Sequence, residues 1–160
     1  MHRKLLIAVA LFAAAVAFAG EPELKPAQEE GKEEFEKSIA EPLKALNEKC
    51  GTKITTVKTD FHNFKSDEWS GMAYYSWCNP VVEGITALCE RPAYKKAIAK
   101  KLQGIQCLFS GVQGPKKDDG SNEGTLRNMS FDKGQFIFHM AKDAANVSDN
   151  AKAVMEKALN

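Results

Sequence analysis

The sequence lacks the short motifs that identify common exported enzymes and metal proteins. It has no His-Glu-x-x-His zinc motif, no Gly-x-Ser-x-Gly nucleophile motif and no Cys-x-x-Cys redox motif. No apolar run reaches the roughly 18 residues that a membrane-spanning helix requires. The formal net charge is only +1, so wholesale coating of nucleic acid is not the default role. An ordinary globular composition remains, with 44% hydrophobic and 27% charged residues.

The first 19 residues have the pattern of a secretory signal peptide. A short basic start, residues 2–4, precedes an uninterrupted apolar run over residues 5–19, and Ala17 and Ala19 fit the small-x-small rule for cleavage. The alternative is an N-terminal membrane anchor, but as a helix this run spans only about 22 Å of a hydrocarbon core of about 30 Å. We therefore expect cleavage after Ala19 and export to the periplasm or the medium.

Cysteine gives the clearest structural signal in the rest of the chain. The four cysteines are Cys50, Cys78, Cys89 and Cys107. An even number in an exported protein predicts two disulfides, and the spacing matches no zinc-binding pattern. A helix predicted over residues 80–90 would hold Cys78 and Cys89 on the order of 15 Å apart, whereas a disulfide requires Cα atoms within about 7 Å. We therefore expect Cys50 to pair with Cys78 or Cys89, and Cys107 to pair with the other.

Hydrophobic periodicity predicts a flexible mature N-terminus, residues 20–28, followed by a single domain, residues 29–160. Helical patterns cover residues 27–49, 80–90 and 92–103, and a last helix after Ser148 as its N-cap. Pro42 is expected to kink or restart the first helix. The pattern over residues 66–77 favours a helix but also fits a strand. Strand patterns cover residues 53–61, 105–109, 125–131 and 135–141, with residues 132–134 as a three-residue hairpin loop.

This order groups the helices and links the later strands by a hairpin, which is typical of an α+β fold. We predict a small, mainly antiparallel sheet of about four strands. It packs against four or five helices and is stapled by two disulfides. The helices are expected to cover one face of the sheet.

The most unusual surface feature is a block of positive charge. Residues 91–117 contain seven lysines and arginines and no acid. This block is either a solvated helix face or a binding surface for an anionic glycan, a lipid headgroup or an acidic protein. Lysine in place of arginine argues against tight bidentate phosphate recognition. The candidate binding residues in this block are Lys95, Lys96, Lys100 and Lys101.

A second candidate surface is aromatic. Trp69, Tyr74, Tyr75 and Trp77 lie close together in the sequence. Aromatic side chains dominate both protein cores and the energetic centres of interfaces. We expect both tryptophans in the core, and we expect Tyr74 or Tyr75 as an exposed contact.

Candidate catalytic and metal-binding side chains are few. After cleavage only His62 and His139 remain as histidines, and Asp60 with His62 would supply one ligand fewer than a catalytic zinc site needs. The acids at residues 118–123 lack the spacing of a calcium-binding EF-hand loop. We therefore predict no catalytic residue, no metal and no cofactor.

Together these features predict a small exported, disulfide-stabilised binding or interaction protein without catalytic activity. Its basic patch is expected to contact a protein, an anionic surface or a glycan. We expect neither a nucleic-acid partner nor a transmembrane segment after signal cleavage. The alternative is an exported, hydrolase-like enzyme that uses His62 or His139 with a nearby carboxylate.

Overall fold

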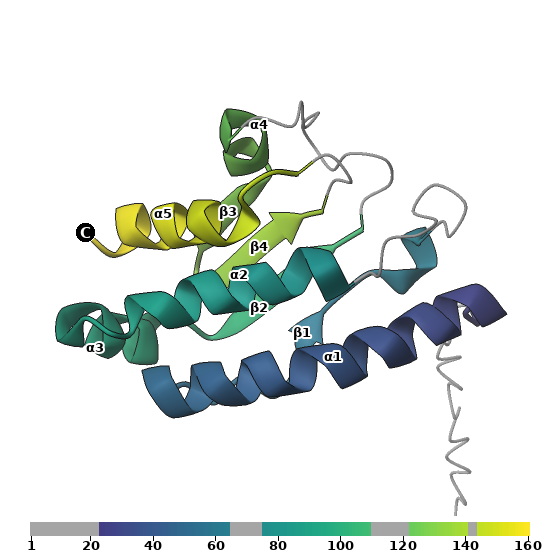
Figure 1. Ribbon diagram of the computed structural model, residues 1–160, viewed down its shortest axis with the longest axis horizontal. Helices are drawn as coiled ribbons and strands as arrows, with labels where there is room; N and C mark the ends of the chain where they lie inside the picture. Colours follow the sequence, from purple (N-terminus) through teal and green to yellow (C-terminus); the bar gives the residue numbers. More distant parts are fainter. Residues whose placement is uncertain (1–22, 65–74, 110–121, 141–143) are drawn as a thin grey trace, which may run out of the picture.

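The computed structural model describes residues 23–64, 75–109, 122–140 and 144–160, so the expected signal peptide lies outside the described residues. A four-stranded sheet carries a layer of helices across one face (Figure 1). The elements in chain order are α1 (Pro26–Cys50), β1 (Val57–Lys58), the 3₁₀ helix η1 (Phe61–Asn63), α2 (Tyr75–Leu88), α3 (Pro92–Lys101), β2 (Gly104–Leu108), α4 (Asn122–Arg127), β3 (Met129–Asp132), β4 (Gln135–His139) and α5 (Val147–Leu159).

The sheet has the strand order β1-β2-β4-β3 and is mixed. β1 pairs with β2 and β2 pairs with β4 in parallel, while β3 and β4 form an antiparallel hairpin. The α+β class is therefore confirmed, but the prediction of a mainly antiparallel sheet was wrong. Strands β1 and β2 are joined through α2 and α3, and a helical crossover of this kind brings two strands together in the same direction.

The two faces of the sheet differ in burial. Along β2 and β4, Ile105, Cys107, Phe136 and Phe138 are at most 1% exposed and face the helices. The alternate residues of both strands are only partly buried. In the part of the chain that the structure describes, α1, α2 and α5 all lie on the same side of the sheet (Figure 1). The hydrophobic core therefore lies between one helical layer and one face of the sheet.

Helix α1 confirms the helical spacing read from the sequence. Its core-facing side chains, none more than 5% exposed, are Phe35, Ile39, Leu43 and Leu46. The helix continues through Pro42 to Cys50 and does not restart there. Gly51 ends it in the left-handed conformation at φ 74°, with its N–H donating to the Asn47 carbonyl.

Helix α1 begins within one residue of the helical pattern over residues 27–49. It starts at Pro26, inside the segment 20–28 that was expected to be flexible. The side chain of Gln28 is 7% exposed, and its amide donates to the carbonyl oxygens of His62 and Phe64. These two hydrogen bonds attach the first turn of the helix to η1.

Three element boundaries depart from the sequence prediction because local signals were assigned to the wrong element. Pro80 does not start a helix but lies inside α2, which begins at Tyr75. The strand expected over residues 53–61 is reduced to β1, and η1 follows it. The last helix is preceded by Asn146 at φ 48°, so Ser148 lies in its first turn and is not its N-cap.

The β3–β4 hairpin is tighter than predicted. Residues 122–127 form α4, so the strand expected from Thr125 begins only at Met129. Asp132 pairs with Gln135 as part of the ladder, which leaves a two-residue turn. Lys133 and Gly134 both have positive φ, at 47° and 80°, as the tight turn of a twisted hairpin requires.

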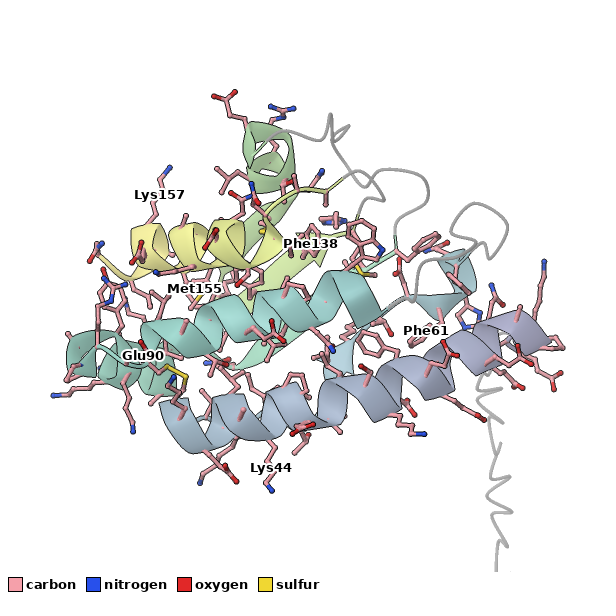
Figure 2. The ribbon with its side chains drawn as sticks, viewed as in Figure 1. Lys44, Phe61, Glu90, Phe138, Met155 and Lys157 are labelled. Carbon is pink, nitrogen blue, oxygen red and sulfur yellow. A yellow bond between two sulfur atoms is a disulfide. The ribbon has the colours of Figure 1, made fainter. Side chains whose placement is uncertain are left out.

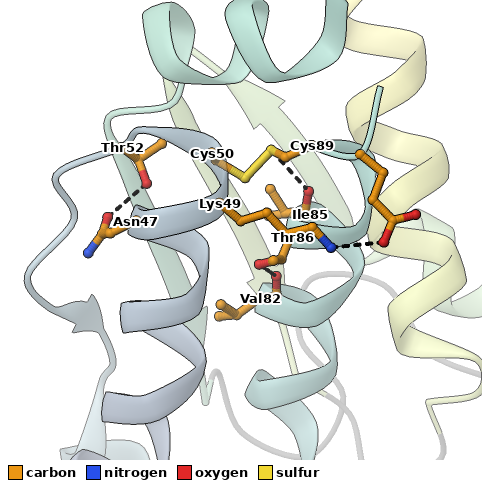
Figure 3. Close-up of a disulfide and its surroundings, with 9 residues drawn as sticks. Asn47, Lys49, Cys50, Thr52, Val82, Ile85, Thr86 and Cys89 are labelled. Atoms are coloured by element: carbon orange, nitrogen blue, oxygen red, sulfur yellow. Dashed lines mark hydrogen bonds and ion pairs between the residues drawn. A yellow bond between two sulfur atoms is a disulfide. The ribbon is translucent and has the colours of Figure 1, made fainter. Parts of the chain in front are cut away.

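Two disulfides tie the helical layer together and to the sheet. Cys50 pairs with Cys89, which joins the end of α1 to the chain just after α2 (Figure 3). Cys78 pairs with Cys107, which joins the first turns of α2 to β2. The exclusion of a Cys78–Cys89 bridge is confirmed, because α2 separates these two cysteines along its length. The structure also decides the pairing that the sequence left open.

Candidate functional site

The candidate basic surface is built on α3, a short helix at one end of the molecule (Figure 1). Pro92 occupies the first turn, where its missing N–H costs nothing. Ile98 is fully buried and Leu102 is 5% exposed, so these side chains anchor the helix to the core. Tyr94 and Ala97 are half-buried beside them. The remaining side of α3 faces solvent.

All four predicted lysines lie on this solvent-facing side. Lys95, Lys96, Lys100 and Lys101 are exposed. Among the residues that the structure describes, none of the four forms an ion pair. Lys100 and Lys101 lie in the last turn, where positive charge also stabilises the negative end of the helix dipole. Within the described part of the chain, no acid therefore neutralises these four charges through a direct ion pair.

Arg91, which begins the same charge block, has a structural role. Its guanidinium lies 4.0 Å from the centre of the Tyr94 ring and also pairs with the Glu156 carboxylate on α5. The hydroxyl of Tyr94 is hydrogen-bonded to the Asn160 side chain at 3.0 Å. These contacts hold α3 against α5, so the arginine positions the lysines and its own charge is matched by an acid.

Lys53 joins this surface from a different part of the chain. The side-chain oxygen of Asn47 accepts hydrogen bonds from the Ile54 backbone N–H at 2.9 Å and from the Thr52 hydroxyl at 2.7 Å. The side-chain N–H of Asn47 donates to the Ile54 carbonyl at 2.7 Å, and together these hydrogen bonds fix the loop after α1. Lys53 and Lys100 then line a shared cleft of about 240 Å³ between this loop and α3. The sequence pattern assigned Lys53 to a strand and gave no sign of this approach.

Lys133 lies in the β3–β4 turn, next to the end of α3. The backbone N–H groups of Gln103 and Gly104 donate to the Gly134 carbonyl at 2.8 and 3.2 Å. Lys133 is exposed, and Asp132 beside it is the one exposed acid of this turn. We use the term basic end for the six lysines gathered from these three segments: Lys53, Lys95, Lys96, Lys100, Lys101 and Lys133.

Of the four aromatic candidates, the structure describes the side chain of Trp77 alone. Tyr74 lies outside the described residues, and Tyr75 is the first residue of α2. Trp77 is 7% exposed, which confirms its place in the core, and Trp69 lies outside the described residues. The prediction of an exposed tyrosine contact stays a prediction.

The histidines lie at the carboxyl ends of the parallel strands. Burial lowers the pKa of His139, and the nearby carboxylate of Asp60 partly opposes this by raising it. Asp60 itself accepts hydrogen bonds from the Phe109 backbone N–H and from the Asn63 side chain, so it links the ends of β1 and β2. His62 is exposed on η1. One histidine with an acid nearby is the arrangement that the enzyme alternative requires.

The described residues contain no group of three or more His, Cys, Asp or Glu side chains that could hold a metal ion. The acidic loop at residues 118–123 lies almost wholly outside the described residues, so that part of the prediction is not addressed. Among the helices that the structure describes, none combines the length and apolar character needed to cross a bilayer. Comparison with protein-family models, with curated proteins and with solved structures gives no significant match.

Proposed function

We propose that this protein is a small exported, disulfide-stabilised binding protein without catalytic activity, and that its basic end contacts an anionic partner. The observation that carries the proposal is the gathering of six exposed lysines from three separate segments at one end of the fold. Among the described residues, none of the six forms an ion pair. Like charges held together repel one another, and a bound anion relieves that repulsion.

The type of charge indicates the type of partner. Lysine is a compact, flexible point charge, whereas arginine provides a planar fork for bidentate contacts. A surface of lysines therefore suits a partner with many dispersed negative charges, such as a membrane of anionic headgroups or a sulfated glycan. Binding of this kind weakens steeply as salt screens the charges.

Export is supported by the cysteines. All four form disulfides, and structural disulfides form and persist in oxidising compartments. An anionic cell-surface lipid or glycan is then a partner that the protein would meet in its own compartment.

The test compares two quadruple variants with the same net charge. The first replaces Lys95, Lys96, Lys100 and Lys101 with glutamine; the second makes the same change at exposed lysines away from the basic end, which are Lys32, Lys37, Lys44 and Lys58. Binding is measured to vesicles containing phosphatidylglycerol and, separately, to heparin, at low and physiological salt. A lysine near an anionic surface contributes about 1 kcal/mol, so the first variant should lose at least about tenfold in affinity to one of the two probes.

The second variant is expected to bind within about threefold of the native protein. Equal losses in the two variants would mean that net charge, and not the basic end, controls binding. No binding of the native protein to either probe would remove the anionic-surface proposal. Hydrolysis of a chromogenic ester that disappears in His139→Gln would instead favour the enzyme alternative.

A further inference from the structure

An apolar groove lies on the opposite edge of the helical layer from α1, between α5, α4 and β3. Its volume is about 530 Å³, within the range of sites that hold small ligands and side chains. Leu126 and Val154 line it with partly buried aliphatic side chains, and Met129 and Phe131 form its floor on β3. Ala153 on α5 is exposed at its rim. A groove with this lining accepts apolar side chains.

Strand β3 forms one wall of this groove and is also an edge strand. Among the described strands, β4 alone pairs with β3. The His139 N–H donates a hydrogen bond to the Asn128 carbonyl at 2.9 Å, so Asn128 and His139 are a hydrogen-bonded pair of the hairpin. In an antiparallel pair, hydrogen-bonded and non-hydrogen-bonded positions alternate. Met129 and Phe131 are therefore non-hydrogen-bonded positions, whose backbone N–H and carbonyl groups point away from β4.

The same two residues thus serve the edge and the groove at once. In the register of the hairpin, Met129 pairs with Phe138 and Phe131 pairs with Phe136, so all four side chains lie on the same face of the sheet. This is the face that packs against the helices. A third strand laid antiparallel along β3 would place the residues opposite Met129 and Phe131 on that face. Two of its side chains, spaced two residues apart, would then enter the groove. A short edge alone would not mark a docking site, but an edge aligned with an apolar groove does.

The charge at the rim selects among possible occupants. Lys157 is exposed and is the single charged residue in the lining, and it projects from α5 on the side away from α2 (Figure 2). A second copy of this chain, paired through the same surface, would bring a second Lys157 to the patch, because a two-fold interface matches a surface with itself. An acidic peptide brings the opposite charge to the same position.

We propose that an extended peptide adds to the free edge of β3 as a further strand, with two apolar side chains at positions i and i+2 in the groove and an acidic group near Lys157. Backbone hydrogen bonds to Met129 and Phe131 supply general affinity, and the groove supplies selectivity for the alternating apolar residues. This site is separate from the basic end, and it does not depend on the function proposed above.

The probe is a fluorescein-labelled hexapeptide with leucine at positions 2 and 4, glutamate at position 6 and threonine elsewhere. Its binding to the oxidised protein is followed by fluorescence anisotropy. A control peptide of the same composition carries its leucines next to each other, so that only one can enter the groove. The control is expected to bind at least about tenfold more weakly, as for loss of one well-packed apolar anchor.

Two matched variants locate the site on the protein. Ala153→Glu places a larger, charged side chain at the groove, while Ala45→Glu makes the same change at an exposed position of α1. Because both positions are exposed helical alanines, neither variant is expected to disturb folding. Ala153→Glu should weaken binding of the alternating peptide at least about tenfold, and Ala45→Glu should leave it within about twofold. Lys157→Gln should weaken the peptide ending in glutamate but not one ending in glutamine.

Amide hydrogen exchange tests the added strand itself. Binding should slow exchange at the Met129 and Phe131 amides more than at Ser130, whose N–H already faces β4. Three results would overturn the proposal: equal binding of the two peptides, unchanged binding by Ala153→Glu, or protection of these amides by self-association without peptide. If oleate binds in the groove and neither peptide binds, the peptide proposal would also be overturned and the groove would be a lipid site.

Discussion

Gly84 on α2 faces the backbone of α5, and replacing it with alanine should destabilise the protein although alanine is the better helix former. A β-carbon at this position would meet the carbonyl oxygen of Ser148 inside van der Waals contact and would lie 3.0 Å from its carbonyl carbon. Backbone atoms cannot move aside as a side chain can. The two helices would therefore have to separate, which would loosen the core between them; Ile85 on α2 and Met155 on α5 belong to this core and are both fully buried.

Two opposing energies decide the sign of this change. Alanine gains about 1 kcal/mol over glycine in a helix interior. Inserting an extra methyl group into a well-packed core typically costs about 1–3 kcal/mol, and a clash with backbone atoms belongs at the upper end, about 3 kcal/mol. We therefore expect Gly84→Ala to lower the free energy of unfolding by about 2 kcal/mol.

Urea unfolding of the oxidised protein, followed by circular dichroism, measures this loss. Gly31→Ala on α1 is the matched control, since its β-carbon would lie 3.1 Å from the Phe64 ring, a side chain that is able to shift. The control gains the same helix propensity without a backbone clash, so it should be near neutral or stabilising. A Gly84→Ala protein as stable as the native one would refute the close approach of α2 and α5.

Two further predictions concern the cross-links and the pH dependence of stability. Replacing Cys78 and Cys107 together with alanine removes a bridge that spans 29 residues, and this should lower the unfolding free energy by about 3.6 kcal/mol in urea titration; a loss below about 1 kcal/mol would contradict the chain-entropy estimate. Because burial lowers the pKa of His139 below its ordinary value of 6.5, the unfolded chain binds a proton more readily than the folded one. Unfolding free energy should therefore fall as the pH drops below about 6.5, and His139→Gln should flatten that slope; an unchanged slope would remove His139 as its source.

The sequence predicted well those features that depend on local pattern. The spacing of Phe35, Ile39 and Leu43 identified the buried side of α1, because the helical period follows directly from the order of residues. The same applied to the alternation along β2 and β4. The exclusion of one disulfide pairing also succeeded, because it required only the length of a helix.

Errors arose where a local signal competed with tertiary packing. Pro80 resembles a helix start, yet Trp77, Cys78 and Val81 are all buried, so α2 begins earlier and keeps the proline inside. Strand direction depends on which strands the crossover helices bring together. Nothing between Gly51 and Phe61 reveals that β1 runs parallel to β2 and β4.

The candidate sites divide in the same way. Lys95, Lys96, Lys100 and Lys101 were found from a charge block that is visible in the sequence. Lys53 and Lys133 were missed, since a loop held by a side chain and a hairpin turn bring them to α3 only in the folded chain. The groove beside β3 was also missed, because its lining comes from three elements separated by other structure.

The positions of the disulfides divide the fold into two parts of different covalent constraint. Both bridges lie within residues 50–107, and no cross-link reaches β3, β4 or α5. A partial opening that releases α5 from α2 therefore leaves α1, α2 and β2 linked to one another, so α5 can pack again on an intact surface. Proteins open in such cooperative units at free energies below that of global unfolding. The groove lies in the part that is free to open, whereas five of the six lysines of the basic end lie within the cross-linked residues 50–107 and Lys133 lies outside them.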